Sequence, residues 1–406
     1  MRVLAQAHAL VVAHVRAGAG AGPRRGAGAS PAAAGRYSVT GEPAAAPDPG
    51  AAERGGISSP APEGPDRVVT RPPIWHSVEE VPAALGPTAV SIGNYDGVHR
   101  GHRYVLDQLR HHAEVRGLEP VALTFWPHPR HVMGDPSATP LLTGHEDRDR
   151  LLLLAGMHGV LDLAFTLDFA QYSPEDFVRV FLVEGLGAKC VVLGEDALFG
   201  RANAGTIDTM RELGERYGFE VVTVDDLGPE GAGTGRLSSS GIRRDLLAGD
   251  VRAANEALGR LHTVTDVVHH GFQRGRELGF PTANLGPAPQ GLIPADGVYA
   301  GYATVTAQIP AHEGTEPLTG APATISIGTN PTFEAHGAPQ RTVEAYVLGA
   351  HDHDLYGDTL RLEFVDFQRP TLKFDSIDAL VAQMREDVQV TRRTLADERS
   401  RSGAAG

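Results

Sequence analysis

Short apolar runs alternate with longer stretches of helical periodicity over residues 74–259, and this alternation most restricts the fold. The β-prone runs are 88–92, 120–125, 160–166, 188–193 and 219–224. The stretches with helical periodicity are 102–116, 145–157, 174–185 and 205–217. Ser173, followed by proline and two acidic residues, is typical of a helix start. Repeated strand–helix units predict an α/β domain in which a parallel sheet carries helices on both faces.

After Gly259 the β-prone runs follow one another without helices between them. They are rich in Val, Thr, Tyr and Phe, and they cover 263–269, 297–306, 322–327, 341–348 and 360–367. Successive strands separated by Gly and Pro predict a small closed antiparallel barrel. A final helical pattern from Ile377 to about Leu395 predicts a helix that packs against it. We therefore expect two domains, 74–259 and 260–397.

The ends of the chain lack these patterns. Residues 1–72 are dominated by Ala, Gly, Pro and Arg without sustained periodicity, which predicts a disordered low-complexity extension. Its apolar start is interrupted by Gln6 and His8 and lacks a strongly basic opening, so we do not expect a signal peptide. Residues 398–406 are expected to form a flexible tail.

Composition narrows the class of partner. The 406 residues carry a formal net charge of −14, which argues against nucleic acid, because nucleic-acid binders present basic surfaces. No apolar run approaches the roughly 20 residues of a membrane span. The one cysteine, Cys190, excludes an internal disulfide and fits a reducing cytoplasm. We therefore expect a cytoplasmic protein that acts on small molecules, and the sequence leaves its oligomeric state open.

A glycine turn after the run 88–92 is a candidate phosphate site. Residues 93–102 read G-N-Y-D-G-V-H-R-G-H and lead into a helical pattern. The free N–H groups and positive dipole end of a helix N-terminus attract anions. The imidazoles of His99 and His102 could donate hydrogen bonds to oxygens that gain charge in a transition state. A histidine-rich surface turn is the alternative for the histidines alone, but the strand before and the helix after favour phosphate binding.

Two further stretches have polar side chains suited to phosphates or metal. Residues 236–243 read R-L-S-S-S-G-I-R, in which hydroxyl and guanidinium groups could hold a phosphate, although serines that open a helix usually serve as caps. Residues 271–284 contain three glycines and end in P-T-A-N. Thr282 and Asn284 lie two apart, so on an extended segment both point to one side and offer oxygen ligands suited to Mg²⁺. From spacing alone, a glycine-rich hairpin with satisfied polar groups is an equal alternative.

These motifs together resemble the bacterial bifunctional riboflavin kinase/FMN adenylyltransferase (FAD synthetase) family. Residues 93–102 match its nucleotidyltransferase signature, and residues 236–243 correspond to R-x-S-S-T-x-x-R. Residues 275–284 match its riboflavin kinase signature, and 292–301, 325–333 and 341–346 follow in the family's order. The resemblance covers residues from about 74 to 395. It implies a Rossmann-like nucleotidyltransferase domain followed by a riboflavin kinase barrel with a C-terminal helix.

The resemblance also implies roles for single residues. Glu344 is the base that takes the proton from the ribityl 5′-hydroxyl, Thr282 and Asn284 bind Mg²⁺ with ATP, and His99 and His102 are catalytic in adenylyl transfer. The residues expected to bind ATP or its phosphates are Gly93, Asp96, Gly101, Arg236, Ser239, Ser240, Arg243, Gly275, Gly279, Phe280 and Pro281.

The first domain departs from the family near the expected flavin and nucleotide site. Trp126 stands in T-F-W-P-H-P, two residues before His128, where the family usually has Asp. Asp196 and Ala197 replace the usual Asn and Phe of G-x-N-F-x-F-G. Ionised Asp only accepts hydrogen bonds and repels polyphosphate, unless it binds Mg²⁺ or is protonated. We expect these changes at one site to alter specificity or weaken turnover.

The sequence therefore predicts an enzyme that uses ATP and Mg²⁺ twice. The C-terminal domain would phosphorylate riboflavin to FMN, and the N-terminal domain would adenylylate FMN to FAD with release of pyrophosphate. The alternative is a riboflavin kinase whose N-terminal domain is inactive or changed in specificity. A non-catalytic flavin-binding protein is a third possibility, which the intact kinase residues disfavour.

Overall fold

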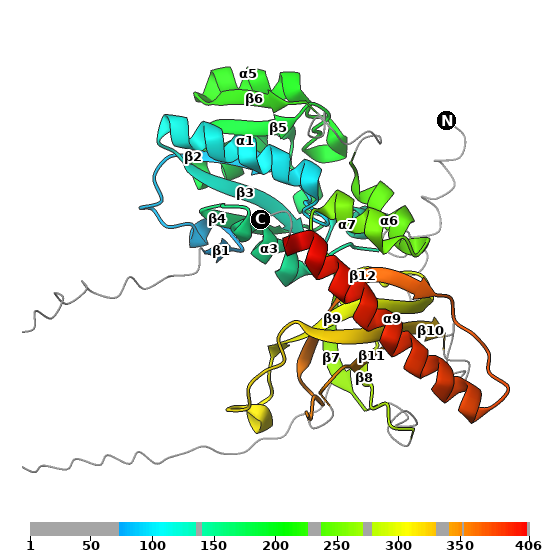
Figure 1. Ribbon diagram of the computed structural model, residues 1–406. Coiled ribbons are helices and arrows are strands. Elements are labelled where there is room, and N and C mark those ends of the chain that lie inside the picture. Colours follow the sequence, from blue (N-terminus) through cyan, green and yellow to red (C-terminus); the bar gives the residue numbers. More distant parts are fainter. Residues whose placement is uncertain are drawn as a thin grey trace, which may run out of the picture. The chain divides into compact units, whose positions relative to one another are not determined.

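The structure is a computed structural model that describes residues 73–134, 140–225, 237–270, 278–329, 341–350 and 353–403. Figure 1 shows a sheet flanked by helices, a barrel, and a long helix, α9. The expected extension over residues 1–72 lies outside the described residues. No helix among the described residues is long and apolar enough to span a membrane.

The first domain is built on a six-stranded parallel sheet, as predicted. Its strand order is β1-β4-β3-β2-β5-β6, and every ladder is parallel. The strands are β1 (Ile74–Trp75), β2 (Thr88–Ile92), β3 (Glu119–Trp126), β4 (Gly159–Ala164), β5 (Ala188–Gly194) and β6 (Glu220–Val224). The edge strand β1 was not predicted, because two residues are too few to show a period.

Helices cover both faces of this sheet. α1 (Arg100–Arg116) and α3 (His145–Leu154) pack on one face, and η4 (Val178–Gly185) and α5 (Ile207–Tyr217) pack on the other. The short helices of this part of the chain are α2 (Pro129–Met133) and α4 (Pro174–Phe177). α6 (Ser239–Leu247) and α7 (Val251–Leu258) instead contribute buried residues to the hydrophobic cluster of the barrel. The neighbours Ala89 and Val90 of β2 belong to different hydrophobic clusters, because successive side chains of a strand point to opposite faces. Ala89 packs with Leu106 of α1, and Val90 with Met210 of α5.

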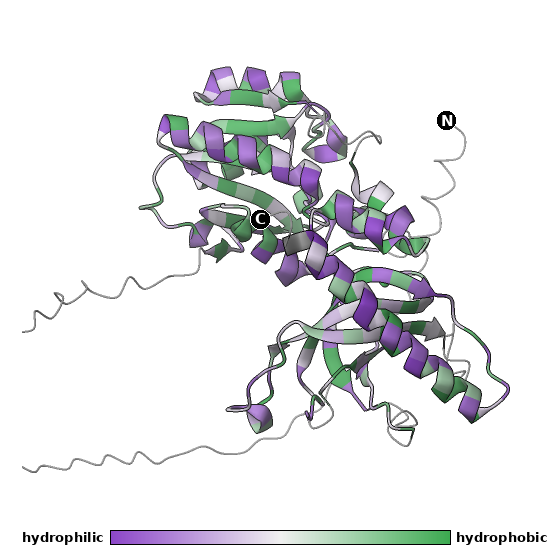
Figure 2. Ribbon diagram, in the orientation of Figure 1, coloured by the Kyte–Doolittle hydropathy of each residue, from purple (hydrophilic) through white to green (hydrophobic). Residues whose placement is uncertain are grey.

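The expected helix over 174–185 forms in two parts. Ser173 caps α4, and its Oγ accepts a hydrogen bond from the backbone N–H of Asp176 at 3.1 Å. Beyond Phe177 the chain continues as the π-helix η4. Figure 2 shows hydrophobic residues concentrated in the strands, whereas α1 mixes hydrophobic and hydrophilic residues along its length.

The second domain is a closed antiparallel barrel, as predicted. Its strands follow the order β10-β11-β8-β7-β12-β9. They are β7 (His262–His269), β8 (Ala283–Leu285), β9 (Gly297–Ala307), β10 (Ala321–Thr329), β11 (Arg341–Val347) and β12 (Thr359–Arg369). β8 was not predicted as a strand, although the interpretation of Thr282 and Asn284 assumed an extended segment there. The barrel core includes the buried side chains of Tyr299, Ile325 and Phe364.

The C-terminal helix α9 (Ile377–Gly403) packs on the barrel strands β9, β10 and β12. Its Leu395 is buried with Ala300 and Val365. The expectation of a flexible tail from residue 398 is wrong as far as Gly403. There the helix continues, and Glu398 pairs with Arg401 three residues later at 2.9 Å.

Candidate active sites

A cavity of about 950 Å³ lies at the carboxyl ends of the parallel strands. From β2 the chain proceeds to β3 on one side of the sheet and later to β5 on the other, so the order reverses between β2 and β5. Open parallel sheets bind ligands at such a reversal. The lining includes residues that directly follow these strands and both helix starts singled out in the sequence: Gly93, Asp96, His99, Gly101, His102, Asp196, Ser239, Ser240 and Arg243.

The glycine turn after β2 has a strained backbone. Tyr95 and Val98 have φ values of 49° and 37°, which are unusual for residues other than glycine and most so for a β-branched one. Tyr95 is held by a hydrogen bond from its Oη to Ser91 Oγ at 2.8 Å. A Cβ on Gly93 would lie 2.9 Å from the Tyr95 ring. Gly93 is therefore required for the shape of the turn.

His99 and His102 form a stacked pair at the start of α1. Their ring centroids are 3.7 Å apart, and His99 Nδ1 accepts a hydrogen bond from the backbone N–H of His102 at 3.3 Å. A Cβ on Gly101 would lie only 3.1 Å from His99 Nδ1, so glycine gives this ring its room. Burial lowers the pKa of His99 to about 4 and that of His102 well below its usual value. Both rings are therefore neutral near pH 7, and a neutral imidazole can donate one hydrogen bond without carrying charge.

Asp96 fastens the turn to the rest of the domain, although the sequence suggested a role toward ATP. Its Oδ1 accepts hydrogen bonds from the backbone N–H groups of Leu142 and Thr143 at 2.8 and 3.4 Å. Its Oδ2 accepts from the guanidinium of Arg243 in a buried ion pair. Burial raises the pKa of Asp96, and the charge of Arg243 opposes that rise. Arg243 also donates from Nε to Pro140 O at 2.6 Å, so much of its hydrogen-bonding capacity is used within the protein.

The serines at the start of α6 divide into different roles. Ser238 is the helix cap, and its Oγ accepts a hydrogen bond from the N–H of Gly241 at 3.2 Å. Ser239 donates from Oγ to the carbonyl of Asp96 at 2.8 Å, which ties α6 to the glycine turn. Ser240 is exposed and lines the cavity. Arg236 lies outside the described residues.

The far part of the cavity has an aromatic wall that the sequence interpretation missed. Its aromatic members are Phe125, Phe165, Phe169, Tyr172, Phe177 and Phe199. The sequence feature that could have revealed this wall is the density of aromatic residues over 165–177. Asp196, Ala197 and His128 also line the cavity, and burial lowers the pKa of His128 to about 4.

Trp126 does not line this cavity, so the expectation that it alters the same site as Asp196 and Ala197 is wrong. Adjacent residues of a strand point to opposite faces, so Trp126 points away from the cavity that Phe125 lines. The Trp126 ring instead stacks on His145 with centroids 4.4 Å apart.

The kinase motif brings its three polar residues together in the barrel. Glu344 on β11 is the direct register partner of Asn284 on β8. Thr282 donates from Oγ1 to Glu344 Oε2 at 3.4 Å, and Asn284 donates from Nδ2 to Thr282 O at 3.2 Å. Burial raises the pKa of Glu344, and the hydroxyl of Thr282 partly opposes the rise.

The segment before β8 gives this motif its shape. Gly279 has a φ of +82°, which glycine adopts readily, and Phe280 and Pro281 follow it. Phe280 packs edge-on against Tyr346 of β11 with ring centroids 5.2 Å apart. Phe280 is therefore a packing residue beside the motif. Gly275 lies outside the described residues.

Comparison with known proteins gives both halves a counterpart. The FAD synthetase family model matches residues 81–240, and the riboflavin kinase family model matches residues 258–395. Among curated relatives, the bifunctional riboflavin kinase/FMN adenylyltransferase of Listeria monocytogenes is 34% identical over 304 residues, which cover 75% of this chain and 91% of the relative. The Bacillus subtilis protein of the same name is 32% identical over 321 residues, 78% of this chain and 95% of the relative.

A solved structure has a similar fold. It is described as a macrolide-efflux protein from Streptococcus pneumoniae, and it superposes with a TM-score of 0.67 at 28% sequence identity. The match covers 79% of this chain and 98% of that protein.

Proposed function

This chain belongs to the family of bifunctional riboflavin kinases/FMN adenylyltransferases, and on that premise we propose which residues perform its two reactions. It phosphorylates riboflavin to FMN with ATP, and it transfers AMP from ATP to FMN, giving FAD and pyrophosphate. We assign the first reaction to the barrel and the second to the parallel-sheet domain. The observation that carries the assignment is that Glu344 and Asn284 are opposite each other on neighbouring strands, with Thr282, just before β8, bonded to Glu344.

In the barrel, Glu344 is the base for the alcohol. Phosphoryl transfer to a hydroxyl needs a positioned carboxylate to take the proton, and little covalent help from the protein. The raised pKa of Glu344 makes its carboxylate a stronger base than an exposed one. Thr282 lies within hydrogen-bonding distance and keeps the carboxylate oriented.

The same residues fit a hard cation held together with ATP. Hydroxyl, amide and carboxylate oxygens are the donors that Mg²⁺ prefers, and Asn284 keeps its amide oxygen because its nitrogen serves Thr282. When bound, Mg²⁺ would neutralise charge on the phosphates of ATP. Thr282 and Asn284 would hold it, and Glu344 would remain the proton acceptor.

In the parallel-sheet domain, a phosphate oxygen of FMN attacks the α-phosphorus of ATP and pyrophosphate leaves. No protein nucleophile is required, so the domain works by orientation and by hydrogen bonds to the phosphates. His99 and His102 donate as neutral imidazoles, and Ser240 with the N–H groups at the start of α6 supplies further donors. The aromatic wall packs against the flavin ring.

Arg243 has a different role from the one that the family motif suggests. Its pairing with Asp96 sets the shape of the glycine turn, and its contact with phosphate is secondary to that pairing. The acidic composition and the one cysteine support a cytoplasmic enzyme for flavins and nucleotides and speak against a nucleic-acid substrate.

The test is to incubate the purified full chain with riboflavin, ATP and Mg²⁺, and to separate the flavins by chromatography. We expect FMN first and FAD later, and no turnover when Mg²⁺ is chelated. FMN without FAD would contradict the roles given to His99 and His102. Unchanged riboflavin would contradict the role of Glu344, and full turnover without a divalent cation would contradict the Mg²⁺ site.

A further inference from the structure

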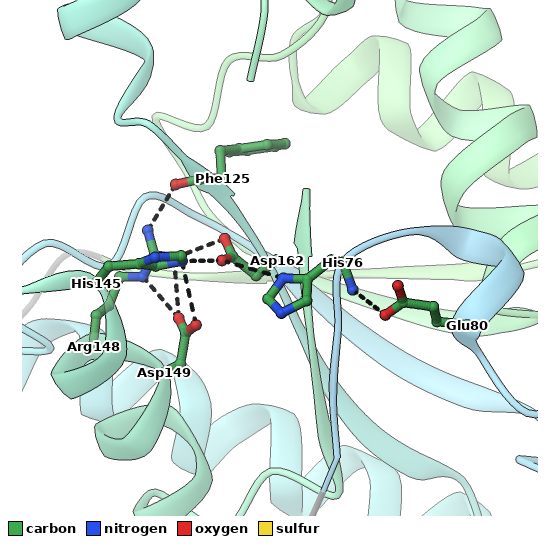
Figure 3. A network of polar contacts seen from close by, with 7 residues as sticks. All are labelled: His76, Glu80, Phe125, His145, Arg148, Asp149 and Asp162. Carbon is green, nitrogen blue, oxygen red and sulfur yellow. Dashed lines mark hydrogen bonds and ion pairs between the residues drawn. The ribbon is translucent and has the colours of Figure 1, made fainter. Parts of the chain in front are cut away.

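A second group of ionisable side chains lies apart from the cavity and the kinase motif (Figure 3). His145 and Asp149 stand one turn apart on α3, Asp162 lies in the middle of β4, and His76 directly follows β1. Both carboxylates are 2% exposed, although ionised groups are rarely buried so deeply without compensation. Neither proposed reaction uses any of the four residues.

Arg148 binds only one oxygen of each carboxylate. Its Nη2 donates to Asp149 Oδ1 at 3.0 Å and to Asp162 Oδ1 at 2.7 Å. Its Nη1 donates to the carbonyl of Phe125 at 2.7 Å. The guanidinium therefore orients both carboxylates while it leaves their Oδ2 atoms to face the histidines.

The Oδ2 atoms and the imidazole nitrogens converge on one small volume. His145 Nε2 contacts Asp162 Oδ2 and lies 3.6 Å from Asp149 Oδ2. His76 Nδ1 lies 4.0 Å from Asp162 Oδ2. The possible ligand atoms of His145, Asp149 and Asp162 all lie within 4.8 Å of one another. Ligands at the Zn–N and Zn–O distances of a tetrahedral zinc site are about 3.3 Å apart, so small side-chain shifts suffice.

The oxygen atoms that face the histidines suit a divalent cation. Two buried carboxylates share one guanidinium, and each keeps its Oδ2 atom on the side of the His145 imidazole. A divalent cation at the Oδ2 atoms would add positive charge beside both carboxylates. Two imidazoles beside two carboxylates suit zinc and similar transition metals better than Mg²⁺, which prefers oxygen alone.

We propose that His76, His145, Asp149 and Asp162 bind one zinc-like divalent transition-metal ion. The Trp126 ring, stacked at an interplanar angle of 5° on His145, fixes the orientation of that imidazole. The backbone N–H of His76 donates to Glu80 Oε2 at 2.8 Å and fixes the approach of the fourth ligand. Figure 3 shows these side chains directed toward one another from β4, α3 and the segment after β1.

The site would stabilise the domain without taking part in either reaction. It joins α3, β4 and the segment after β1, and through Arg148 it holds the end of β3 at Phe125, which lines the cavity. Since binding requires the folded arrangement, metal binding should raise the stability of the parallel-sheet domain.

The test uses the untagged full chain, freed of metal with a chelator and titrated with Zn²⁺ by calorimetry, and with Co²⁺ by visible absorption. We expect one equivalent of each metal to bind, a tetrahedral Co²⁺ spectrum, and a higher thermal midpoint with Zn²⁺. Asp162→Asn and His145→Gln should lose the strong binding. Glu146→Gln, on the exposed side of α3, and His158→Gln, an exposed histidine, should keep it.

His76→Gln and Trp126→Leu keep the test valid if a variant with a buried substitution fails to fold. The His76 side chain is 61% exposed, so its replacement should leave the fold intact while it weakens Zn²⁺ binding. Loss of the Trp126 ring should weaken binding by about 10- to 100-fold, as for other groups that orient a ligand. The proposal is overturned if the metal-free wild-type chain takes up no Zn²⁺, or if these variants bind it as well as the wild type does.

Discussion

Replacing Arg243 by Met should destabilise the parallel-sheet domain much more than a surface charge would. The side chains of Arg243 and Asp96 are only 11% and 6% exposed. Removing one member of a buried pair typically costs about 3–5 kcal/mol, because the other charge stays buried. Asp96 would keep two backbone N–H donors, and its raised pKa makes protonation easier, so we expect about 3 kcal/mol.

Tryptophan fluorescence in urea can measure this loss in one domain. The chain has two tryptophans, Trp75 and Trp126, and both lie in the parallel-sheet domain. The matched control is Arg244→Met. Arg244 is the next residue of α6, and its pair with Asp245 leaves the arginine side chain 77% exposed, so its loss should cost about 0–1 kcal/mol.

The double variant Asp96→Asn with Arg243→Met measures how strongly the two side chains stabilise each other. Because it removes both charges, its loss of unfolding free energy should be smaller than the sum of the losses in the two single variants, by about 0.5–3 kcal/mol. The reasoning is refuted if Arg243→Met unfolds like Arg244→Met, or if the single effects are additive. FAD formation should fall in Arg243→Met, while FMN formation from riboflavin is retained.

Three further predictions follow from the charges and pKa shifts. Asp196→Asn should raise the rate of FAD formation from FMN by about fivefold, since a carboxylate near the incoming phosphates costs about 1 kcal/mol; an unchanged rate would count against that repulsion. Below pH 6.5 the histidines of the unfolded chain bind protons, whereas buried His99 and His262 stay neutral until about pH 4, so the free energy of unfolding measured in urea should fall between these pH values by about 3 kcal/mol for each residue; a flat profile would be inconsistent with their burial. Since Glu344 must be ionised, riboflavin phosphorylation should lose activity on acidification at a pH above 4.5, and a profile still level at that pH would argue against Glu344 as the base.

Periodicity was enough to predict the two architectures. Alternating strand and helix patterns were enough to predict the parallel sheet, because hydrophobic side chains must face a core on both sides of it. The β-prone runs after Gly259, which have no helices between them, were enough to predict the barrel. The misses were short elements such as β1 and β8, whose length gives no period, and the far end of α9.

Side-chain partners distant in sequence could not be predicted in this way. Asp96 and Arg243 lie 147 positions apart, and no local pattern shows that the acid of the glycine turn pairs with an arginine of α6. The sequence also did not show where the side chain of Trp126 points, because a resemblance of motifs does not tell which face of β3 a residue occupies. By contrast, Glu344 and Asn284 came together as the family resemblance implied, since strand register places them opposite each other.

The most direct test of the whole account is to give Glu344→Gln two different starting flavins. With riboflavin, ATP and Mg²⁺ this variant should form FMN about 10²- to 10⁴-fold more slowly than the wild type, as expected for loss of a general base. With FMN in place of riboflavin it should form FAD at the wild-type rate, and Glu363→Gln on β12 should be normal with both flavins. Normal phosphorylation of riboflavin by Glu344→Gln, or an equal loss of both reactions, would contradict the assignment of one reaction to each domain.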